Sequence, residues 1–118
     1  MTKTIAIIAG EPNSISSEII FKIWKLRKKY KHNSLIVIGS SYLFNLQKKK
    51  LKFNIEIKDI DNNFNIRDLI GNKLPIYNVN YKQKKAFQKE SSISNKYIFK
   101  CFETAIKMFF EKKIIGFI

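Results

Sequence analysis

The chain has 118 residues, 45% of them hydrophobic, and its 23 Lys and Arg against 9 Asp and Glu give a net charge of +14. This apolar content suffices for one buried core, so we predict one compact unit. The single cysteine, Cys101, excludes an internal disulfide and any CxxC metal or redox motif, and we expect it to be a small core residue.

Two further classes of protein are disfavoured by the sequence. No run approaches the roughly 18 to 20 apolar residues of a membrane helix, and the start MTKTIAIIAG lacks the cleavage site of a signal peptide. We therefore expect a cytoplasmic protein with no membrane partner. The basic residues are almost all lysines spread along the chain, which favours compositional drift over selection for a polyanionic partner.

The first predicted unit is a strand, a turn and a helix. Thr4 to Ala9 is an apolar run typical of a strand buried on both faces of a parallel sheet. After the turn Gly10-Glu11-Pro12-Asn13, Ser16 is expected to cap a helix with a basic last turn at Arg27 to Lys31. The predicted buried face of this helix consists of Ile19, Ile20, Ile23 and Trp24.

The second unit repeats this order. Leu35 to Ile38 is a buried strand followed by the turn Gly39-Ser40-Ser41 and a short amphipathic helix with Tyr42, Leu43 and Leu46. Two such units predict an α/β fold with three layers and a mostly parallel sheet.

The middle of the chain carries two further strand candidates. Phe53, Ile55 and Ile57 alternate like a half-exposed strand, and Asp59 to Asn65 is expected to be a polar loop. Leu74 to Val79 predicts another strand, with Pro75 near its start.

The last predicted unit is a helix from Ser91 or Ser94 to about Lys112, followed by a buried strand from Ile114 to Ile118. One apolar stripe of this helix is expected to contain Tyr97, Ile98, Cys101, Phe102, Ala105, Ile106 and Phe109. The sequence stops on the last residue of this predicted strand. Ligands of open α/β sheets bind beyond the carboxyl ends of strands, so the sequence stops where a ligand-binding loop would begin, and we expect it to be part of a longer protein. The alternative is a short terminal edge strand.

The candidate site is the turn Gly10-Glu11-Pro12-Asn13, because it joins a buried strand to a helix N-terminus with free amides. Glu11 is placed to hydrogen-bond a substrate amine or hydroxyl, or to orient a cofactor amide. The alternative is a purely structural turn. The turn is neither GxGxxG nor GxxxxGK[ST], so the pattern alone predicts no nucleotide.

The segment IAIIAGEPNSISSEII resembles the N-terminal motif of the 4-hydroxythreonine-4-phosphate dehydrogenase (PdxA) family, a strand followed by GEPAGIGPE. The matching residues are Gly10, Glu11, Pro12, Ile15 and Glu18. Ser14, Ser16 and Ser17 stand where the family has two glycines and a proline. The segment from Ser91 to Ile118 is also similar in its order of elements, and the resemblance covers about a third of a family member.

This resemblance implies NAD(P)-dependent oxidation and decarboxylation of 4-phosphohydroxy-threonine in pyridoxal phosphate biosynthesis, by a homodimer that uses a divalent metal. It implies part of an isocitrate/isopropylmalate dehydrogenase-like fold, with residues 1–118 as the N-terminal part of one dehydrogenase domain. Gly10, Glu11, Pro12 and Asn13 would form a turn that faces cofactor or substrate. The family's metal-binding histidines, GHT motif and phosphate-binding cations belong to later segments, so we expect residues 1–118 to be inactive alone and to bind no cofactor or metal tightly.

The alternative function is a small basic α/β module that binds nucleic acid or another polyanion. Tyr81-Lys82-Gln83-Lys84-Lys85-Ala86-Phe87 interleaves aromatic and basic residues as single-strand binders do, although an exposed loop is the favoured interpretation. The run Lys48 to Lys52 is interpreted as a solvated helix end. His32, the only histidine, is interpreted as solvated or as part of a helix C-cap.

Overall fold

The computed structural model describes residues 3–29 and 33–118. Its strands are β1 (Lys3–Ile8), β2 (Asn33–Gly39), β3 (Ile57–Ile60), β4 (Leu74–Asn78) and β5 (Gly116–Phe117). Its α-helices are α1 (Ser16–Lys25), α2 (Ser41–Lys50) and α3 (Asn95–Phe110). Short 3-10 helices occupy Arg27–Lys29, Ile66–Leu69 and Ser92–Ser94.

The strands form one sheet in the order β3-β4-β2-β1-β5, and every pairing in it is parallel. β1 pairs with β2 along its whole length, from Lys3 opposite Asn33 to Ile8 opposite Ile38. A parallel sheet needs crossover connections, which the helices supply. The predicted parallel core of the first, second and last strands is confirmed.

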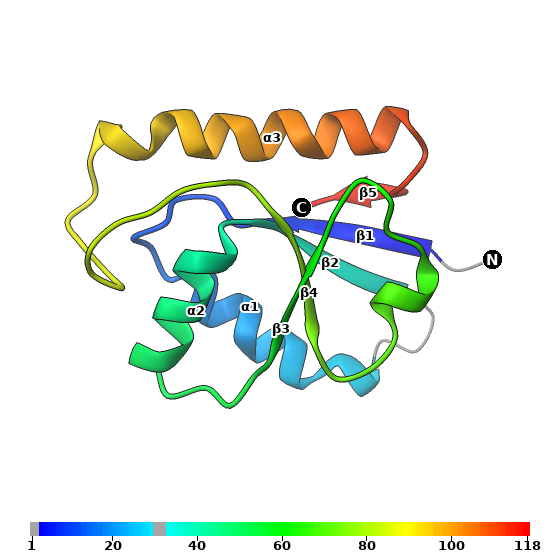
Figure 1. Cartoon of the computed structure of the whole chain (residues 1–118), viewed down its shortest axis with the longest axis horizontal. Helices are drawn as coiled ribbons and strands as arrows, with labels where there is room; N and C mark the ends of the chain where they lie inside the picture. Colours follow the sequence, from blue (N-terminus) through cyan, green and yellow to red (C-terminus); the bar gives the residue numbers. More distant parts are fainter. Residues whose placement is uncertain (1–2, 30–32) are drawn as a thin grey trace.

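The helices lie on both faces of this sheet: α1 and α2 cover one face, and α3 runs along the other (Figure 1). Neighbouring residues of β2 illustrate the two cores. Ile36 belongs to the cluster beneath α3, and Val37 belongs to the cluster beneath α1 and α2. Both side chains are fully buried, which explains the continuous apolar run of this strand. The predicted three-layer α/β fold is confirmed.

The start and the buried face of α1 differ from the prediction. Ser16 is the first helical residue, whereas Ile15 occupies the N-cap position and makes no side-chain cap bond. Ile19 is exposed, and the buried residues are Ser17, Ile20, Phe21 and Trp24. A helical period allows two neighbouring stripes here, and the edge-to-face contact of Phe21 with Phe44 of α2 selects one of them.

The third strand begins later than predicted. β3 starts at Ile57 and includes Asp59, which we had assigned to a polar loop. Phe53 instead follows the end of α2, where its backbone N–H donates to the carbonyl of Lys48 at 2.9 Å. Its ring lies 5.3 Å from that of Phe21. The alternation that suggested a strand reflects a connecting segment packed against α1.

α3 buries a narrower face than predicted. Its buried residues are Tyr97, Cys101, Ala105 and Met108, and Ile98 packs at the margin of the same cluster. Phe102, Ile106 and Phe109, which we had placed on the buried stripe, are exposed. One sheet covers one side of a helix, so the wide apolar surface of α3 exceeds what the sheet can bury.

β5 is a two-residue edge strand rather than a buried strand from Ile114 to Ile118. Ile114 is buried, but Ile118 is 80% exposed. Ile118 still continues the pairing with β1, because its N–H donates to Ala6 at 2.9 Å and its carbonyl accepts from Ile8 at 2.8 Å. The strand is therefore parallel as predicted but lies at the border of the sheet.

Candidate ligand-facing turn

The candidate turn leaves the sheet at the carboxyl end of β1, beside the carboxyl end of β2. The N–H of Ala9 donates to the carbonyl of Ile38 at 3.0 Å, which keeps the two strand ends together. Gly10 then has a φ of 71°, a left-handed conformation that favours glycine and reverses the chain toward α1. Gly39 allows the end of β2 to lie close to the end of β1, because a Cβ at this position would lie only 2.7 Å from the Cβ of Ala9.

Glu11 points from this turn toward the start of α3. One of its carboxylate oxygens, Oε1, accepts from the N–H of Asn13 at 3.2 Å, and Oε2 accepts from the hydroxyl of Ser94 at 3.4 Å. Ser94 is buried and immediately precedes α3. The carboxylate thus links two chain segments that are far apart in sequence, and the long bond to Ser94 is the weaker of its two contacts.

Pro12 and Asn13 tie the turn to the rest of the molecule. The carbonyl of Pro12 accepts from the side-chain amide of Gln47 at 2.7 Å. The side-chain oxygen of Asn13 accepts from Gln83 at 2.7 Å and from the N–H of Gln88 at 2.9 Å. The amide group of Asn13 returns a bond to Gln83 at 3.3 Å. These contacts indicate that Pro12 and Asn13 hold the turn against α2 and against the loop that contains Gln83 and Gln88.

Hydroxyl groups close the turn where the resembled motif has glycines. The hydroxyl of Ser14 donates to the carbonyl of Glu11 at 2.8 Å and accepts from the N–H of Ser16 at 3.1 Å. The oxygens of Ser14 and Ser16 lie 2.7 Å apart. One backbone donor at the start of α1, which would be available to an anion in a glycine turn, is therefore bonded within the chain.

Two stacked tyrosines, Tyr81 and Tyr97, pack between the end of β2 and the start of α3. The hydroxyl of Tyr97 accepts from the N–H of Ser40 at 2.9 Å, and the rings of Tyr81 and Tyr97 stack with centroids 4.7 Å apart. Burial raises the pKa of Tyr97 well above its usual range. Burial, and secondarily the charge of Glu11, raise the pKa of Tyr81. Both phenols stay neutral at ordinary pH and act as hydrogen-bonding groups.

Gln47, Ser94 and Tyr97 were not among the predicted site residues. Tyr97 and Ser94 are more than eighty residues from the turn, so no local motif connects them with it. Gln47 offered a weak signal, because it lies three and four residues after Phe44 and Leu43 on the buried face of α2. A polar residue on an apolar helical face must find partners in the core.

A shallow cavity of about 460 Å³ adjoins the turn on its other side. Its lining residues are Asn13, Ser14, Ile15, Glu18, Phe87 and Glu90. Two carboxylates in this lining disfavour a phosphate group there. Glu11 faces α3 and is not part of this lining, so the cavity and the carboxylate do not form one site.

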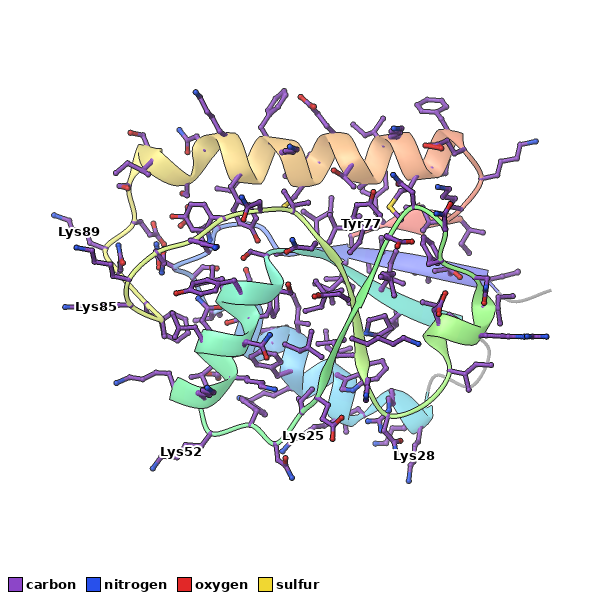
Figure 2. The ribbon with its side chains drawn as sticks, in the orientation of Figure 1. Lys25, Lys28, Lys52, Tyr77, Lys85 and Lys89 are labelled. Carbon is purple, nitrogen blue, oxygen red and sulfur yellow. The ribbon has the colours of Figure 1, made fainter. Side chains whose placement is uncertain are left out.

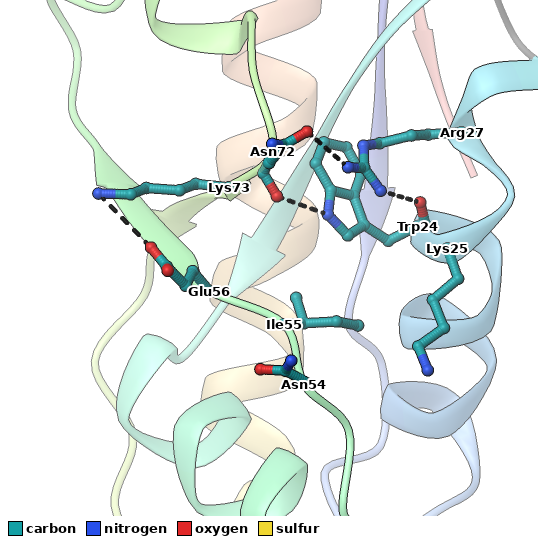
Figure 3. A pocket seen from close by; sticks show the side chains of 8 residues that line it. All are labelled: Trp24, Lys25, Arg27, Asn54, Ile55, Glu56, Asn72 and Lys73. Atoms are coloured by element: carbon teal, nitrogen blue, oxygen red, sulfur yellow. Dashed lines mark hydrogen bonds and ion pairs between the residues drawn. The ribbon is translucent and has the colours of Figure 1, made fainter.

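A second cavity, of about 480 Å³, is lined by residues that precede β3 and β4 and by the end of α1, and none of the turn residues lines it (Figure 3). Trp24 and Arg27 lie at its wall, and both donate to Asn72, at 3.3 and 2.9 Å. Lys73 pairs with Glu56 at 3.7 Å on the opposite side. Ligands of parallel sheets bind at the carboxyl ends of the strands, whereas this cavity lies at the amino ends. The polar side chains at its wall bond one another, so we do not assign a ligand to it.

The part of the chain described by the structure offers no metal centre: among residues 3–29 and 33–118, no three His, Cys, Asp or Glu side chains gather. The described residues do not fit the divalent metal that the family resemblance implies, so no chemical step through a metal is assigned to them. Lys31 and His32 lie outside the described residues. No helix in the described ranges is long and apolar enough to cross a membrane.

The basic segments differ in how they meet solvent. Lys52, Lys85 and Lys89 extend away from the molecule (Figure 2). The side chain of Lys48, by contrast, donates to the carbonyl of Ile55 at 2.7 Å and so connects α2 with the segment that follows it. The segment from Tyr81 to Phe87 forms no helix or strand and is partly exposed, which agrees with the predicted loop, but Tyr81 is half-buried on Tyr97. Its ring is not free to stack on a nucleic-acid base.

Comparisons with known proteins support the fold. No protein-family model matches the sequence, and no curated protein matches it. The structure is similar to the crystal structure of a 4-hydroxythreonine-4-phosphate dehydrogenase from Burkholderia phymatum, with a TM-score of 0.81 and 14% sequence identity. The similarity covers 97% of this chain and 34% of that chain. This chain therefore folds like about a third of that dehydrogenase.

Proposed function

We propose that this chain is the N-terminal part of an NAD(P)-dependent dehydrogenase related to 4-hydroxythreonine-4-phosphate dehydrogenase. The complete enzyme would oxidise and decarboxylate 4-phosphohydroxy-threonine in pyridoxal phosphate biosynthesis, as a cytoplasmic homodimer with a divalent metal. The observation that carries the proposal is the fold similarity over 97% of this chain, with Gly10-Glu11-Pro12 at the carboxyl end of β1. Sequence motif and tertiary position agree at this turn.

Glu11 is the residue of the turn that we assign to ligand contact. Its partner Ser94 lies at 3.4 Å, so an amine, hydroxyl or amide donor of a ligand can replace this weak bond at little cost. Pro12 and Asn13 would hold the loop, and Gly10 would set its direction. In this division of tasks, the chain supplies one acceptor for substrate or cofactor, and the metal and phosphate contacts come from other parts of the enzyme.

An activity assay tests the expected dependence on those other parts. The purified 118-residue protein should produce no NADH or NADPH from 4-phosphohydroxy-threonine, with or without added Mg²⁺ or Zn²⁺, because it lacks a cluster of metal ligands among its described residues. Absorbance at 340 nm reports the reduced cofactor. Steady production above a heat-denatured control would contradict our assignment of an incomplete site.

The role of Glu11 is tested by changing the residue that matches it to Gln in a full-length 4-hydroxythreonine-4-phosphate dehydrogenase. Loss of one charged hydrogen bond to the ligand should lower kcat/KM by roughly tenfold or more. A turn residue without ligand contact would alter stability by only a few tenths of a kcal/mol. Unchanged kinetics with an unchanged melting temperature would remove Glu11 from the proposed site.

A further inference from the structure

The segment from Asn80 to Glu90, which we call the strap, contains no helix or strand and connects β4 with the 3-10 helix before α3 (Figure 1). Directly after β2, the hydroxyl of Ser40 donates to the carbonyl of Tyr81 at 2.6 Å. Further along the strap, the side chain of Gln83 donates to that of Asn13, in the turn after β1, at 2.7 Å. Because β4, β2 and β1 are neighbours in the sheet, the strap passes their carboxyl ends in this order.

Side chains hold the strap against the candidate turn. Among the residues that the structure describes, no backbone-to-backbone hydrogen bond involves the strap. Instead, the side chains of Asn13 and Gln83 exchange two bonds, at 2.7 and 3.3 Å, and Asn13 accepts a third from the N–H of Gln88 at 2.9 Å. Gln47 adds one bond from α2 to the carbonyl of Ala86 at 2.8 Å. Asn13 therefore carries most of this attachment.

The strap contributes little to the two cores. Each of its residues is exposed or half-buried, and the half-buried Tyr81 is held by its stack on Tyr97. Segments with few buried contacts open at a lower free energy than the whole fold. The part of the strap that follows Tyr81 can therefore leave the surface while the sheet and its helices stay intact.

We propose that the strap is a lid over the candidate turn, with Tyr81 as its fixed end and the amide pair of Asn13 and Gln83 as its latch. The N–H of Asn13 donates to Glu11 at 3.2 Å, so the latch lies directly beside the carboxylate. Opening clears the approach to Glu11 from the carboxyl edge of the sheet, where ligands of such sheets bind. Asn13 stands at the alanine of the resembled motif GEPAGIGPE, so the latch is a feature of this chain. Admission of a ligand rests on the proposed function, whereas the opening and the access to position 11 do not.

Native-state hydrogen exchange tests whether the strap opens separately from the fold. The N–H of Gln88 should exchange more slowly than in an unstructured peptide, because the latch protects it, and at least tenfold faster than that of Val37 in β2. Low urea concentrations should accelerate exchange at Val37 and leave Gln88 unchanged, since a local opening exposes little surface. Exchange of Gln88 at the peptide rate, or in parallel with Val37, would overturn the lid.

Limited digestion with trypsin tests the latch. Asn13→Ala removes all three bonds to the strap, so cleavage after Lys84 and Lys85 should accelerate roughly tenfold or more, because cleavage follows the open population. Gln83→Ala should act in the same direction, and the double variant should add little to Asn13→Ala, since both changes break one pair.

Asn72→Ala is the matched control for the digestion. The side chain of Asn72 also accepts a hydrogen bond, from Arg27 at 2.9 Å, but lies before β4, at the opposite end of the sheet. Circular dichroism verifies that each variant folds. No acceleration by Asn13→Ala, or equal acceleration by Asn72→Ala, would refute the latch.

A thiol label tests whether the lid controls access to position 11. Glu11→Cys should react with a maleimide roughly tenfold faster when Asn13→Ala is added, because the open state becomes more populated, and no faster when Asn72→Ala is added. Cys101 is buried and does not compete. An unchanged rate would show that the strap does not cover Glu11. These measurements need no substrate or cofactor, so their failure would leave the dehydrogenase proposal standing, and the failure of that proposal would leave the lid.

Discussion

Gln47 shows how a single buried polar side chain can hold the candidate turn in place. Its side chain is 1% exposed, and its amide donates to the carbonyls of Pro12 at 2.7 Å and Ala86 at 2.8 Å. Without these bonds, the buried carbonyl of Pro12 would lose its partner, whereas the carbonyl of Ala86 would keep the amide of Gln83 at 3.2 Å. The position of Glu11 therefore depends on a residue of α2 that has no part in the resembled motif.

Replacement of this side chain is the first prediction. Gln47→Leu keeps the volume and removes both donors, so the free energy of unfolding should fall by about 1–3 kcal/mol. Urea denaturation followed by circular dichroism measures the change. Asn45→Ala on the exposed side of α2 is the control and should change stability by less than about 0.5 kcal/mol. Equal effects of the two variants would show that the buried bonds contribute nothing specific.

Cys101 carries the second prediction, which concerns pH. Burial raises the pKa of its thiol to about 11, against a weaker lowering by the hydrogen bond with Tyr97. The thiol should therefore resist Ellman's reagent at pH 8 in the folded chain and react at once in 6 M guanidinium chloride. Rapid reaction of the folded chain at that pH would contradict the burial of this group.

The sign of the pH effect on stability follows from the same shift. An unfolded thiol ionises near pH 9 and the folded one near pH 11, so the unfolded state loses its proton first. The stabilising contribution is complete below pH 9 and is lost as the pH rises toward 11. Chemical denaturation across this range should give a steeper loss of stability for the unmodified chain than for Cys101→Ala.

At the scale of elements, α1 and α2 begin in different ways although serines precede or open both helices. Ser40 caps α2: its hydroxyl oxygen accepts from the N–H of Leu43 at 3.1 Å, and its O–H donates to the carbonyl of Tyr81 at 2.6 Å. Ser16 does not cap α1, because its hydroxyl contacts Ser14 in the turn. A serine becomes a cap only when the preceding chain places it outside the first helical turn in an extended conformation.

Ser40→Ala is the third prediction. The variant removes the cap of α2 and the donor to the loop at Tyr81, so we expect a loss of about 1–2 kcal/mol in the free energy of unfolding. Thermal and urea unfolding provide the measurement. Ser92→Ala, at an exposed position in a 3-10 helix, is the matched control. A loss no larger than that of the control would mean that water replaces both bonds.

For the whole molecule, the charge of +14 is a property of the surface, and its lysines are dispersed. Lys25 and Lys28 lie along the lower side of the molecule in Figure 2, whereas Lys85 and Lys89 extend from its left end. The aromatic ring of Tyr81 is used inside the protein. These features favour compositional drift over a built polyanion site.

The fourth prediction follows from this dispersion. Binding to DNA or RNA should be weak, independent of sequence and lost as salt rises from about 20 mM toward 150 mM, because released counterions supply the affinity. Fluorescence anisotropy with labelled single-stranded and duplex oligonucleotides of several sequences measures it. A tight complex with one defined sequence at 150 mM salt would instead support the alternative basic binding module.

The strands and their direction were predictable because both faces of a central parallel strand are buried. The apolar runs at Thr4 to Ala9 and Leu35 to Ile38 therefore predict buried parallel strands even when the segments that pack against them are not known. The glycine turn after β1 was also predictable, since Gly10 must adopt a positive φ where the chain reverses. The strands are predictable because every residue of each apolar run is buried, and the turn is predictable because it depends on the conformation of one glycine.

Which face of each helix is buried could be decided only from the tertiary structure. The apolar surface of α3 spans more than one stripe, and only its contact with the sheet buries Cys101 and exposes Phe102. The same holds at the candidate site, where Glu11 meets Ser94 and Pro12 meets Gln47 across long stretches of sequence. Local residues thus determine which segments become strands, helices and turns. Which face is buried, and which polar groups meet, depends on partners that only the folded chain brings together.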